Sequence, residues 1–390
     1  MRALARHVRR RGGRRRTAAC RPLAALLLAG TVLVACNGSD SSSEGPPTDT
    51  DSAPGPPAVT QTERPDGPPV EGVVTIATRL AVPWGIAFFP GGDALVSERD
   101  EATLLRVTSR GQVTTLARVD GVTPTSEGGL LGVAVSPDYE RDQLIFAYAT
   151  TATDNRVLSG TIADFRAGTP RPVITGIPRG EIHDGGRIAF GPDGMLYVST
   201  GETGNGDLAQ DLTSLGGKIL RIESSGAIPP DNPFPGSPVW TYGHRNVQGI
   251  TWDSHGRMWE CEFGSQLWDE INLIVPGHDY GWPAAEGTAD LPGMTNPRAV
   301  FSTDAASPSG LAFAHGSLWM GALQGATTWR VPIEADGVLG QPVAVRLADA
   351  RTRTVVLAPD GRLWVTTSDR DGRGDPAPDA DVILAIIPRT

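Results

Sequence analysis

The side chains that could do chemistry in this chain are a histidine, three arginines, an asparagine and a glutamate, each close to the start of a short apolar segment. They are Glu127, His183, Arg245, Asn246, Arg351 and Arg353. An imidazole can accept a proton at neutral pH and release it afterwards. Each guanidinium can bind a carboxylate or a phosphate through two parallel hydrogen bonds. If the fold brings these residues together, they predict a site for a small polyanionic ligand beside a general base.

The same residues also have a purely structural interpretation. A lone histidine such as His183 is more often structural than catalytic, and the arginines could simply pair with the abundant acids. The sequence contains no G-x-S-x-G elbow, no G-x-x-x-x-G-K-[ST] phosphate loop, and no H-E-x-x-H or paired C-x-x-C spacing. The absence of these motifs argues against zinc chemistry and gives no sign of a serine hydrolase or a P-loop nucleotide-binding protein.

Six repeats indicate which elements position these residues. Each repeat is a short apolar strand, a turn, and a second strand rich in Leu, Val, Tyr or Trp. The copies are anchored on Gly85, Gly132, Arg187, Gly249, Gly310 and Thr354. The spacings of 47, 55, 62, 61 and 44 residues suit blades of four strands with variable loops. An all-β, six-bladed β-propeller is therefore predicted, with a two-sheet sandwich as the alternative.

A propeller would gather the candidate residues at one place. Its innermost strands converge on a central channel, and the residues just before those strands line one mouth of that channel. His183 lies four residues before the anchor Arg187, and the other candidates precede or begin their own repeats. A non-catalytic propeller that binds a sugar, a glycan or a protein at this mouth would use the same residues.

The first 69 residues are expected to lie outside the folded domain. Nine arginines and no acids precede the apolar run "PLAALLLAGTVLVA", so residues 1–35 predict a signal peptide. It ends in "LVAC", which is similar to a bacterial lipobox and predicts lipidation of Cys36; an incidental cysteine after an ordinary signal peptide is the alternative. Residues 36–69 predict a disordered tether, and 70–390 the propeller. We therefore expect an extracytoplasmic protein, lipid-anchored to the outer face of the cytoplasmic membrane.

Charge and cysteine content narrow the class of protein further. Without the nine leader arginines, 25 basic residues face 44 acidic ones, a formal charge of about −19. A nucleic-acid partner is not expected, because phosphate binding needs a basic face. Cys261 is the one cysteine beyond the leader and the lipobox, so a large core rather than disulfides must hold the domain together.

Nine segments occur in an order and spacing typical of one known family. They are "PWGIAFFPGGDALVSER", "EGGLLGVAVSPDY", "HDGGRIAFGPDGMLYVSTGE", "GGKILRI", "DNPF", "YGHRNVQGI", "DEINLIVPGHDYGWP", "PSGLAF" and "RTRTVVLAPDG". Through them, Val73 to Pro388 resembles the soluble pyrroloquinoline quinone (PQQ)-dependent sugar dehydrogenases, the glucose/sorbosone dehydrogenase family, and in particular its aldose-dehydrogenase branch.

The resemblance implies a six-bladed propeller with PQQ over the central channel and a calcium ion that polarises the ortho-quinone. His183 matches the general base that takes the hydroxyl proton of the sugar while hydride passes to the quinone, and Arg245 stabilises charge on the reduced cofactor. The implied cofactor-binding residues are Glu127, His183, Arg245, Asn246, Gln324, Arg351 and Arg353. The implied reaction oxidises aldoses to lactones and passes electrons to an acceptor that the sequence leaves unidentified.

The resemblance also implies two calcium sites. The backbone carbonyls of Gly264 and Ser265 match the ligands of the cofactor's calcium, while Glu270 and the carbonyl of Tyr280 match a second, structural site. Without metal, Glu270 and Tyr280 would instead stabilise a long loop. A calcium-dependent lactonase with a related propeller would need channel carboxylates that the sequence does not place.

This sequence departs from the glucose dehydrogenases at three positions. Gln324 replaces a lysine that contacts the quinone, Glu127 replaces a glutamine, and Ser265 replaces a proline whose carbonyl role survives the exchange. Losing a cation and gaining an anion is expected to weaken binding of a tricarboxylate. The acid-rich "DRDGRGDPAPDAD" lacks the spacing of an EF-hand and is predicted to be a solvated loop.

Overall fold

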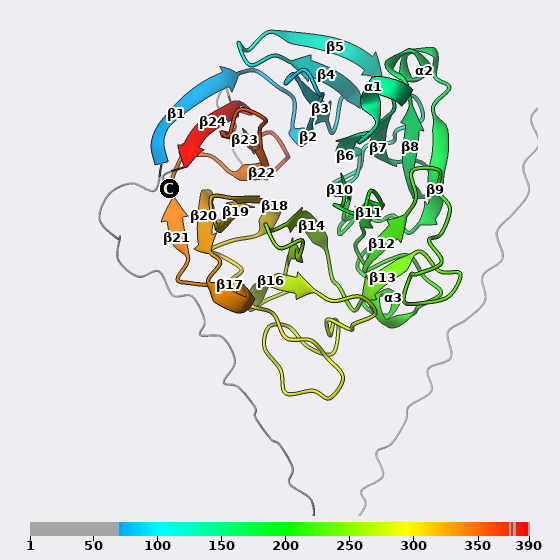
Figure 1. Ribbon diagram of the computed structural model, residues 1–390, viewed down its shortest axis with the longest axis vertical. Helices are drawn as coiled ribbons and strands as arrows, with labels where there is room; N and C mark the ends of the chain where they lie inside the picture. The colour runs from blue at the N-terminus through cyan, green and yellow to red at the C-terminus, as the bar shows by residue number, and fades with distance from the viewer. Residues whose placement is uncertain (1–69, 374–375, 377–379, 389–390) are drawn as a thin grey trace, which may run out of the picture. The chain divides into compact units, whose positions relative to one another are not determined.

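The computed structural model describes residues 70–373, 376 and 380–388. The predicted signal peptide, the predicted lipidation site Cys36 and the predicted tether all lie outside these residues. Six four-stranded antiparallel sheets surround a common centre (Figure 1). The fold is therefore the predicted six-bladed β-propeller and not a two-sheet sandwich. None of the helices in this part of the chain has both the length and the apolar character needed to span a membrane.

Each blade contains four strands, and we number the blades one to six by their innermost strands. The innermost strands are β2 (Pro83–Phe88), β6 (Leu130–Val135), β10 (Ile188–Phe190), β14 (Val247–Trp252), β18 (Pro308–Ala314) and β22 (Thr352–Leu357). The second strands are β3 (Ala94–Glu98), β7 (Ile145–Thr150), β11 (Leu196–Ser199), β15 (Met258–Glu262), β19 (Ser317–Ala322) and β23 (Leu363–Thr367). Each of the six sequence repeats is the innermost and second strand of one blade, so the repeat-based prediction is confirmed.

The third and fourth strands complete the blades. The third strands are β4 (Thr103–Val107), β8 (Asn155–Gly160), β12 (Lys218–Ile222), β16 (Trp268–Ile274), β20 (Thr327–Pro332) and β24 (Ile383–Pro388). The outermost strands are β5 (Val113–Arg118), β9 (Arg171–Ile177), β13 (Val239–Tyr242), β17 (Ala299–Ser302), β21 (Val343–Val345) and β1 (Val70–Ala77). The short helices are α1 (Tyr139–Asp142), α2 (Ile162–Ala167), α3 (Asp207–Gln210) and the 3-10 helix η1 (Ala335–Gly337).

Blade six is built from both ends of the described chain. Its inner three strands come last in the sequence, and β1 pairs antiparallel with β24 as the outermost strand. Val70 lies opposite Pro388, and Thr75 lies opposite Leu384. This pairing closes the ring.

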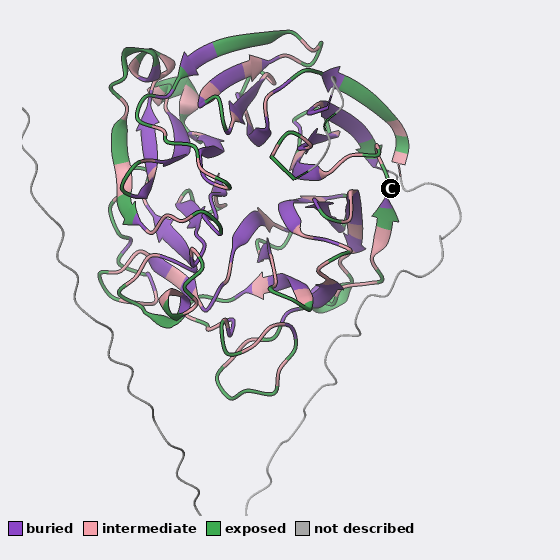
Figure 2. Ribbon diagram, turned by 180° about the vertical axis from the view of Figure 1, so that it is seen from behind, coloured by how far each residue is buried: buried purple, intermediate pink, exposed green. Residues whose placement is uncertain are grey.

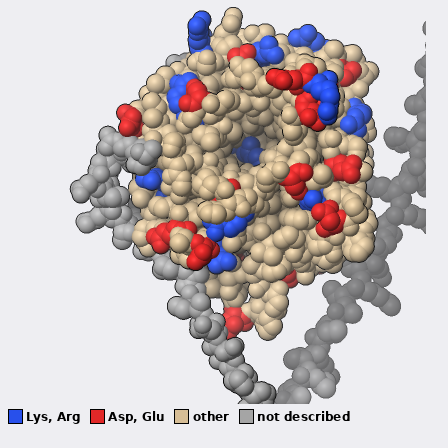
Figure 3. Space-filling view, viewed as in Figure 1, with Lys and Arg blue, Asp and Glu red and all other residues tan. Residues whose placement is uncertain are grey.

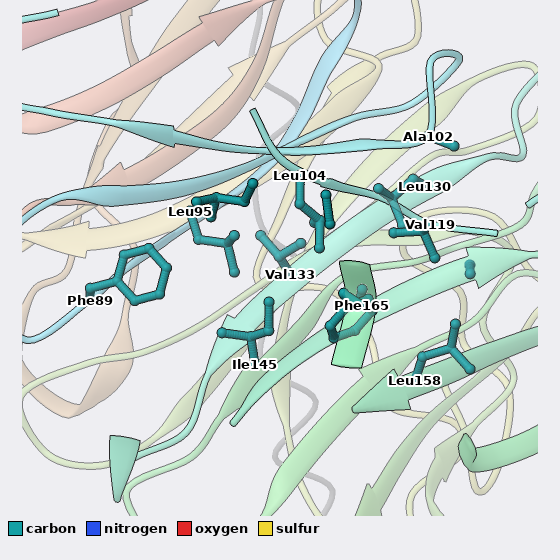
Figure 4. Packing of buried hydrophobic residues seen from close by; sticks show 14 residues of the cluster. Phe89, Leu95, Ala102, Leu104, Val119, Leu130, Val133, Ile145, Leu158 and Phe165 are labelled. Atoms are coloured by element: carbon teal, nitrogen blue, oxygen red, sulfur yellow. The ribbon is translucent and has the colours of Figure 1, made fainter. Parts of the chain in front are cut away.

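The core lies between the blades. Six clusters of buried apolar side chains join neighbouring blades, and buried residues follow the strands nearest the centre (Figure 2). Figure 4 shows the cluster between blades one and two, in which Leu95 and Leu104 pack with Val133, Ile145 and Phe165. Removing this apolar area from water is the main favourable contribution to the fold.

Glycines let the innermost strands approach one another. A Cβ on Gly132 would lie 2.3 Å from the carbonyl oxygen of Gly186, and one on Gly310 would lie 2.5 Å from the backbone nitrogen of Val355. A side chain at either position would push two blades apart. The glycine anchors of the repeats therefore mark the points of closest approach around the channel.

Because the strands alternate in direction, two sets of loops lie at the same mouth. One set joins the outermost strand of a blade to the innermost strand of the next, and the other joins the second and third strands within a blade. The sequence repeats pointed to the first set alone. The second set doubles the number of segments that can contribute side chains to a site.

Lys218, the first residue of β12, holds the longest loop of blade three. Its fully buried Nζ donates hydrogen bonds to the carbonyls of Leu208, Ala209 and Gly216 at 2.6, 2.9 and 2.7 Å.

Replacing Lys218 with methionine should lower the free energy of unfolding by about 2 kcal/mol, because buried carbonyls lose their donor. Urea unfolding measures the change; the exposed Arg141→Met is the control, and an unaltered Lys218→Met midpoint would contradict the assignment.

Candidate active site

The structure links the predicted site residues of blades two, three and four through a chain of hydrogen bonds at one mouth. The backbone N–H of His183 donates to Glu127 Oε2 at 2.9 Å. Two residues on, the N–H of Gly185 donates to Asn246 Oδ1 at 3.0 Å. The carbonyl of Arg245 accepts the N–H of Glu202, also at 2.9 Å. The convergence expected from the repeats is therefore present in the structure.

The ring of His183 is held by a carboxylate that the sequence interpretation did not assign. Its Nδ1 lies 2.5 Å from Oε1 of Glu202, and the two side chains are 10% and 3% exposed. Because a carboxylate accepts, this contact places the proton on Nδ1 and leaves the Nε2 lone pair free. Glu202 follows β11 in the β11–β12 loop, which belongs to the second set of mouth loops.

The backbone of His183 is strained. Its φ is +59°, in the left-handed region that favours glycine, and a Cβ on Gly201 would lie 1.9 Å from its carbonyl oxygen. Contacts from Glu127 and Glu202 hold this conformation from two sides. A strained histidine fixed in this way is typical of a functional site.

Asp184, next to His183, is an unusual buried acid. Its Oδ1 accepts hydrogen bonds from Asn155 Nδ2 at 2.8 Å and from the N–H of Gly180 at 3.1 Å. Its Oδ2 is buried without a hydrogen-bond partner among the described residues. Burial raises the pKa of this carboxyl to about 6.

This raised pKa predicts a pH-dependent stability difference. The folded protein holds a proton on Asp184 up to about pH 6, whereas the unfolded chain releases it near pH 3.8. The stabilisation from that proton is present at pH 4 and is lost as the pH rises through 6. Relative to Asp184→Asn, the wild type should therefore lose about 2 kcal/mol of unfolding free energy between pH 4 and pH 7. Urea titrations of both proteins at pH 4 and pH 7 test this, and a pH-independent difference would contradict it.

Arg351 and Arg353 share one buried carboxylate. Their Nη2 atoms lie 3.1 and 3.0 Å from Asp371 Oδ2, and the side chain of Asp371 is only 3% exposed. Burial raises the pKa of Asp371, but the two guanidiniums outweigh it, so the pKa lies below its usual value. Arg353 also donates from Nε to Ser368 Oγ at 2.9 Å. Both arginines thus reach the mouth already oriented.

The prediction of a solvated loop is wrong for two acids of "DRDGRGDPAPDAD". Besides Asp371, Asp381 is fully buried and accepts the backbone N–H groups of Val82 and Asp369. Acid content indicated exposure, but Val82, Arg351 and Arg353, which help to bury these carboxylates, lie outside the segment, so its own composition carried no sign of them.

Glu127 does not bring an uncompensated negative charge to the mouth. Its Oε1 forms an ion pair with the guanidinium of Arg373, from the same β23–β24 segment as Asp371. The expectation that this acid would weaken binding of an anionic ligand treated it as unpaired. Arg373 instead balances Glu127, and the sequence comparison had not assigned it a role.

Arg245 and Gln324 complete the predicted polar lining. Arg245 donates from Nη1 to the carbonyl of Phe263 at 3.2 Å and lies over the ring of Trp282, while its buried Nε has no partner among the described residues. Gln324 is exposed in the β19–β20 loop, next to Leu323, whose carbonyl accepts from Arg351 at 3.4 Å. Gln324 therefore directly follows a residue that contacts Arg351.

The channel below the mouth also contains a cation. Arg187 donates from Nε to the carbonyl of Gln248 at 2.8 Å and from Nη2 to Thr354 Oγ1 at 3.1 Å, which joins blades three, four and six. Burial lowers its pKa to about 9. Figure 3 shows a hollow at the centre of one face with a basic side chain inside it.

Three of the four predicted metal-ligating residues line one small cavity. Gly264, Glu270 and Tyr280 do so together with Arg245 and Glu286. Ser265, the fourth, directly follows Gly264 in the β15–β16 loop and is exposed. The residues predicted for the two calcium sites thus lie close to one another and to Arg245.

A cluster of buried acids adjoins this cavity. Glu262 and Glu270 lie directly opposite each other on β15 and β16, as do Glu260 and Asn272. Burial is the largest cause that raises the pKa of Glu270 to about 8, and the neighbouring carboxylate of Glu262 is the second. Opposed like charges are destabilising unless a proton or a cation neutralises them.

Unpaired oxygens in this cluster fit a hard cation. Glu260 Oε2 and Asn272 Oδ1 are both buried and lack a hydrogen-bond donor within the described part of the chain. His244, Glu260 and Glu262 also place ligand atoms within 4.8 Å of one another. Oxygen-rich surroundings of this kind suit calcium, which takes carboxylate and carbonyl ligands.

Comparison with known proteins agrees with this geometry. Aldose sugar dehydrogenase YliI of Escherichia coli is 29% identical over 341 residues, which is 78% of this chain and 92% of that protein. Quinoprotein glucose dehydrogenase B of Acinetobacter calcoaceticus is 32% identical over 252 residues, 55% of this chain and 53% of that protein. The PQQ-bound structure of an aldose sugar dehydrogenase from Streptomyces coelicolor matches with a TM-score of 0.77 and 50% identity, over 82% of this chain and 99% of that one.

The family profile described as Glucose / Sorbosone dehydrogenase matches residues 80–382, about three quarters of the chain. The resemblance noted in the sequence is thereby confirmed. The chain belongs to the glucose/sorbosone dehydrogenase family.

Proposed function

We propose that this protein is a PQQ- and calcium-dependent dehydrogenase that oxidises aldose sugars to lactones. The observation that carries the proposal is the His183–Glu202 pair, which leaves a free imidazole nitrogen at a mouth that also holds Arg245, Arg351 and Arg353. The names of the related enzymes, among them a quinoprotein and a PQQ-bound aldose sugar dehydrogenase, support the same chemistry.

The residues of the mouth fit an anionic quinone cofactor. Arg351 and Arg353 would hold its carboxylates, and the unpaired Nε of Arg245 offers a further donor. Glu127 is compatible with such a ligand because Arg373 balances its charge. The carbonyls of Gly264 and Ser265 would hold the cofactor's calcium, and Glu270 with the Tyr280 carbonyl a second one.

When bound, PQQ supplies a quinone that accepts hydride from the sugar, and calcium makes that quinone more electrophilic. Nε2 of His183 takes the proton of the anomeric hydroxyl as the hydride leaves the same carbon, which forms the lactone carbonyl. The carboxylate of Glu202 keeps the ring oriented and stabilises the imidazolium. Arg245 stabilises negative charge that develops at the mouth.

Dye reduction by the purified protein, given PQQ and a panel of aldoses with and without calcium, tests the proposal. We expect turnover that needs both PQQ and calcium. A protein that shows no saturable PQQ uptake in a spectral titration would instead be a non-catalytic propeller, and the proposal would fail.

A further inference from the structure

One carboxylate oxygen gathers four consecutive backbone amides of the β15–β16 loop. Oε1 of Glu286 accepts the N–H groups of Ser265, Gln266, Leu267 and Trp268 at 2.8, 2.8, 2.7 and 3.0 Å. Successive amides that point into one concavity form an anion-binding nest. In this protein a side chain of the protein itself fills the nest.

Peptide geometry extends this contact to the carbonyls of the same loop. A trans peptide is planar and directs its N–H and C=O to opposite sides, and the one cis peptide of the described residues is Trp282–Pro283. The unit that carries the Ser265 N–H also carries the Gly264 carbonyl, and the Gln266 unit carries the Ser265 carbonyl. Glu286 therefore turns both carbonyl oxygens to the opposite side of the loop.

The start of the loop is fixed by tight packing. The N–H of Gly264 donates to Asp269 Oδ1 at 2.8 Å. A Cβ on Gly264 would lie 1.8 Å from the carbonyl oxygen of Trp268 and 2.8 Å from Glu286 Oε1. No larger residue fits, so the loop can close tightly around the carboxylate.

Glu286 reaches the mouth from a long connection outside the propeller strands. It belongs to the long connection 275–298 between β16 and β17, which projects from the ring (Figure 1, yellow). Partial burial raises the pKa of Glu286, but the four amides outweigh it, so the pKa lies below its usual value and the group is charged at neutral pH. The contact is thus charge-assisted.

From this geometry we infer that Glu286 is a positioning residue of the cofactor's calcium site, which holds the Gly264 and Ser265 carbonyls in the orientation that binds the ion. The inference rests on the proposed function. It adds a residue that acts through the backbone of the β15–β16 loop rather than as a metal ligand.

Two substitutions separate positioning from charge. Glu286→Asp keeps the charge but withdraws the oxygen by one methylene, so it should release the amides. Glu286→Gln keeps an oxygen in place but loses the charge. Asp290→Asn, an exposed residue of the same connection, is the control for a lost negative charge.

The measured quantity is the calcium concentration that gives half-maximal PQQ uptake by the full-length protein. Uptake is detected by the absorbance of PQQ, and thermal unfolding shows whether each variant is folded. Glu286→Asp should raise this concentration about 10-fold, Glu286→Gln by less, and Asp290→Asn not at all. A folded Glu286→Asp that matches the wild type would overturn the inference and leave the proposed function intact. A wild type whose PQQ uptake ignores calcium would overturn both.

Discussion

Replacing His183 with glutamine should lower kcat by about 10²- to 10⁴-fold, the usual loss when a positioned general base is removed. Glutamine keeps the size of the side chain and can still donate to Glu202, but it cannot take up the hydroxyl proton of the sugar. PQQ uptake should change far less than kcat, because the arginines of the mouth remain. Steady-state dye reduction and a spectral PQQ titration, made on the same preparation, separate these two effects.

His255→Gln is the matched control for this experiment. His255 is exposed in the turn between β14 and β15, at the opposite end of the innermost strands from the mouth, and its loss should leave kcat unchanged. A PQQ-loaded His183→Gln enzyme within a few-fold of the wild type would show that the proton goes elsewhere.

Arg353→Met should raise the PQQ concentration for half-saturation by about 10- to 100-fold, because one charge-assisted contact to a cofactor carboxylate is lost. At saturating PQQ, kcat should stay close to the wild-type value, since Arg353 takes no part in proton transfer. The change also removes one of the two guanidiniums that pair with the buried Asp371, so thermal unfolding must be measured beside the titration.

Arg346→Met provides the comparison for a lost surface charge, because Arg346 is exposed and pairs weakly with an exposed aspartate. Its half-saturation should equal that of the wild type. Equal PQQ affinity in a folded Arg353→Met would mean that Arg353 serves Asp371 alone and does not bind the cofactor.

The sequence alone was sufficient for the fold because the repeats are local. Each innermost hairpin carries its own strand pattern, and glycines such as Gly132 and Gly310 mark close contacts between blades. Once these hairpins are recognised, the position of His183 before β10 and of Arg245 before β14 follows from topology.

The contacts that prepare the site for its ligand could not be predicted in this way. Glu202, Asp371, Arg373 and Glu286 all lie in loops outside the set that precedes the innermost strands. Asp371 meets arginines 18 and 20 residues away, and Arg373 meets Glu127 across 246 residues. A carboxylate in a loop has the same local sequence whether it faces water or an arginine, so hydrophobic patterning cannot distinguish the two cases.

The pairing of β1 with β24 makes blade six, and with it part of the site, depend on two segments that are far apart in the sequence. Arg351, Arg353 and Asp371 all belong to blade six, whose innermost three strands follow every other blade in sequence. Blades two, three and four, which hold the His183–Glu202 pair, all precede these residues in the sequence. We therefore expect PQQ uptake to require the completed ring. A chain that stops before β24 would contain His183 but would lack the complete blade six that holds Arg351 and Arg353 in place.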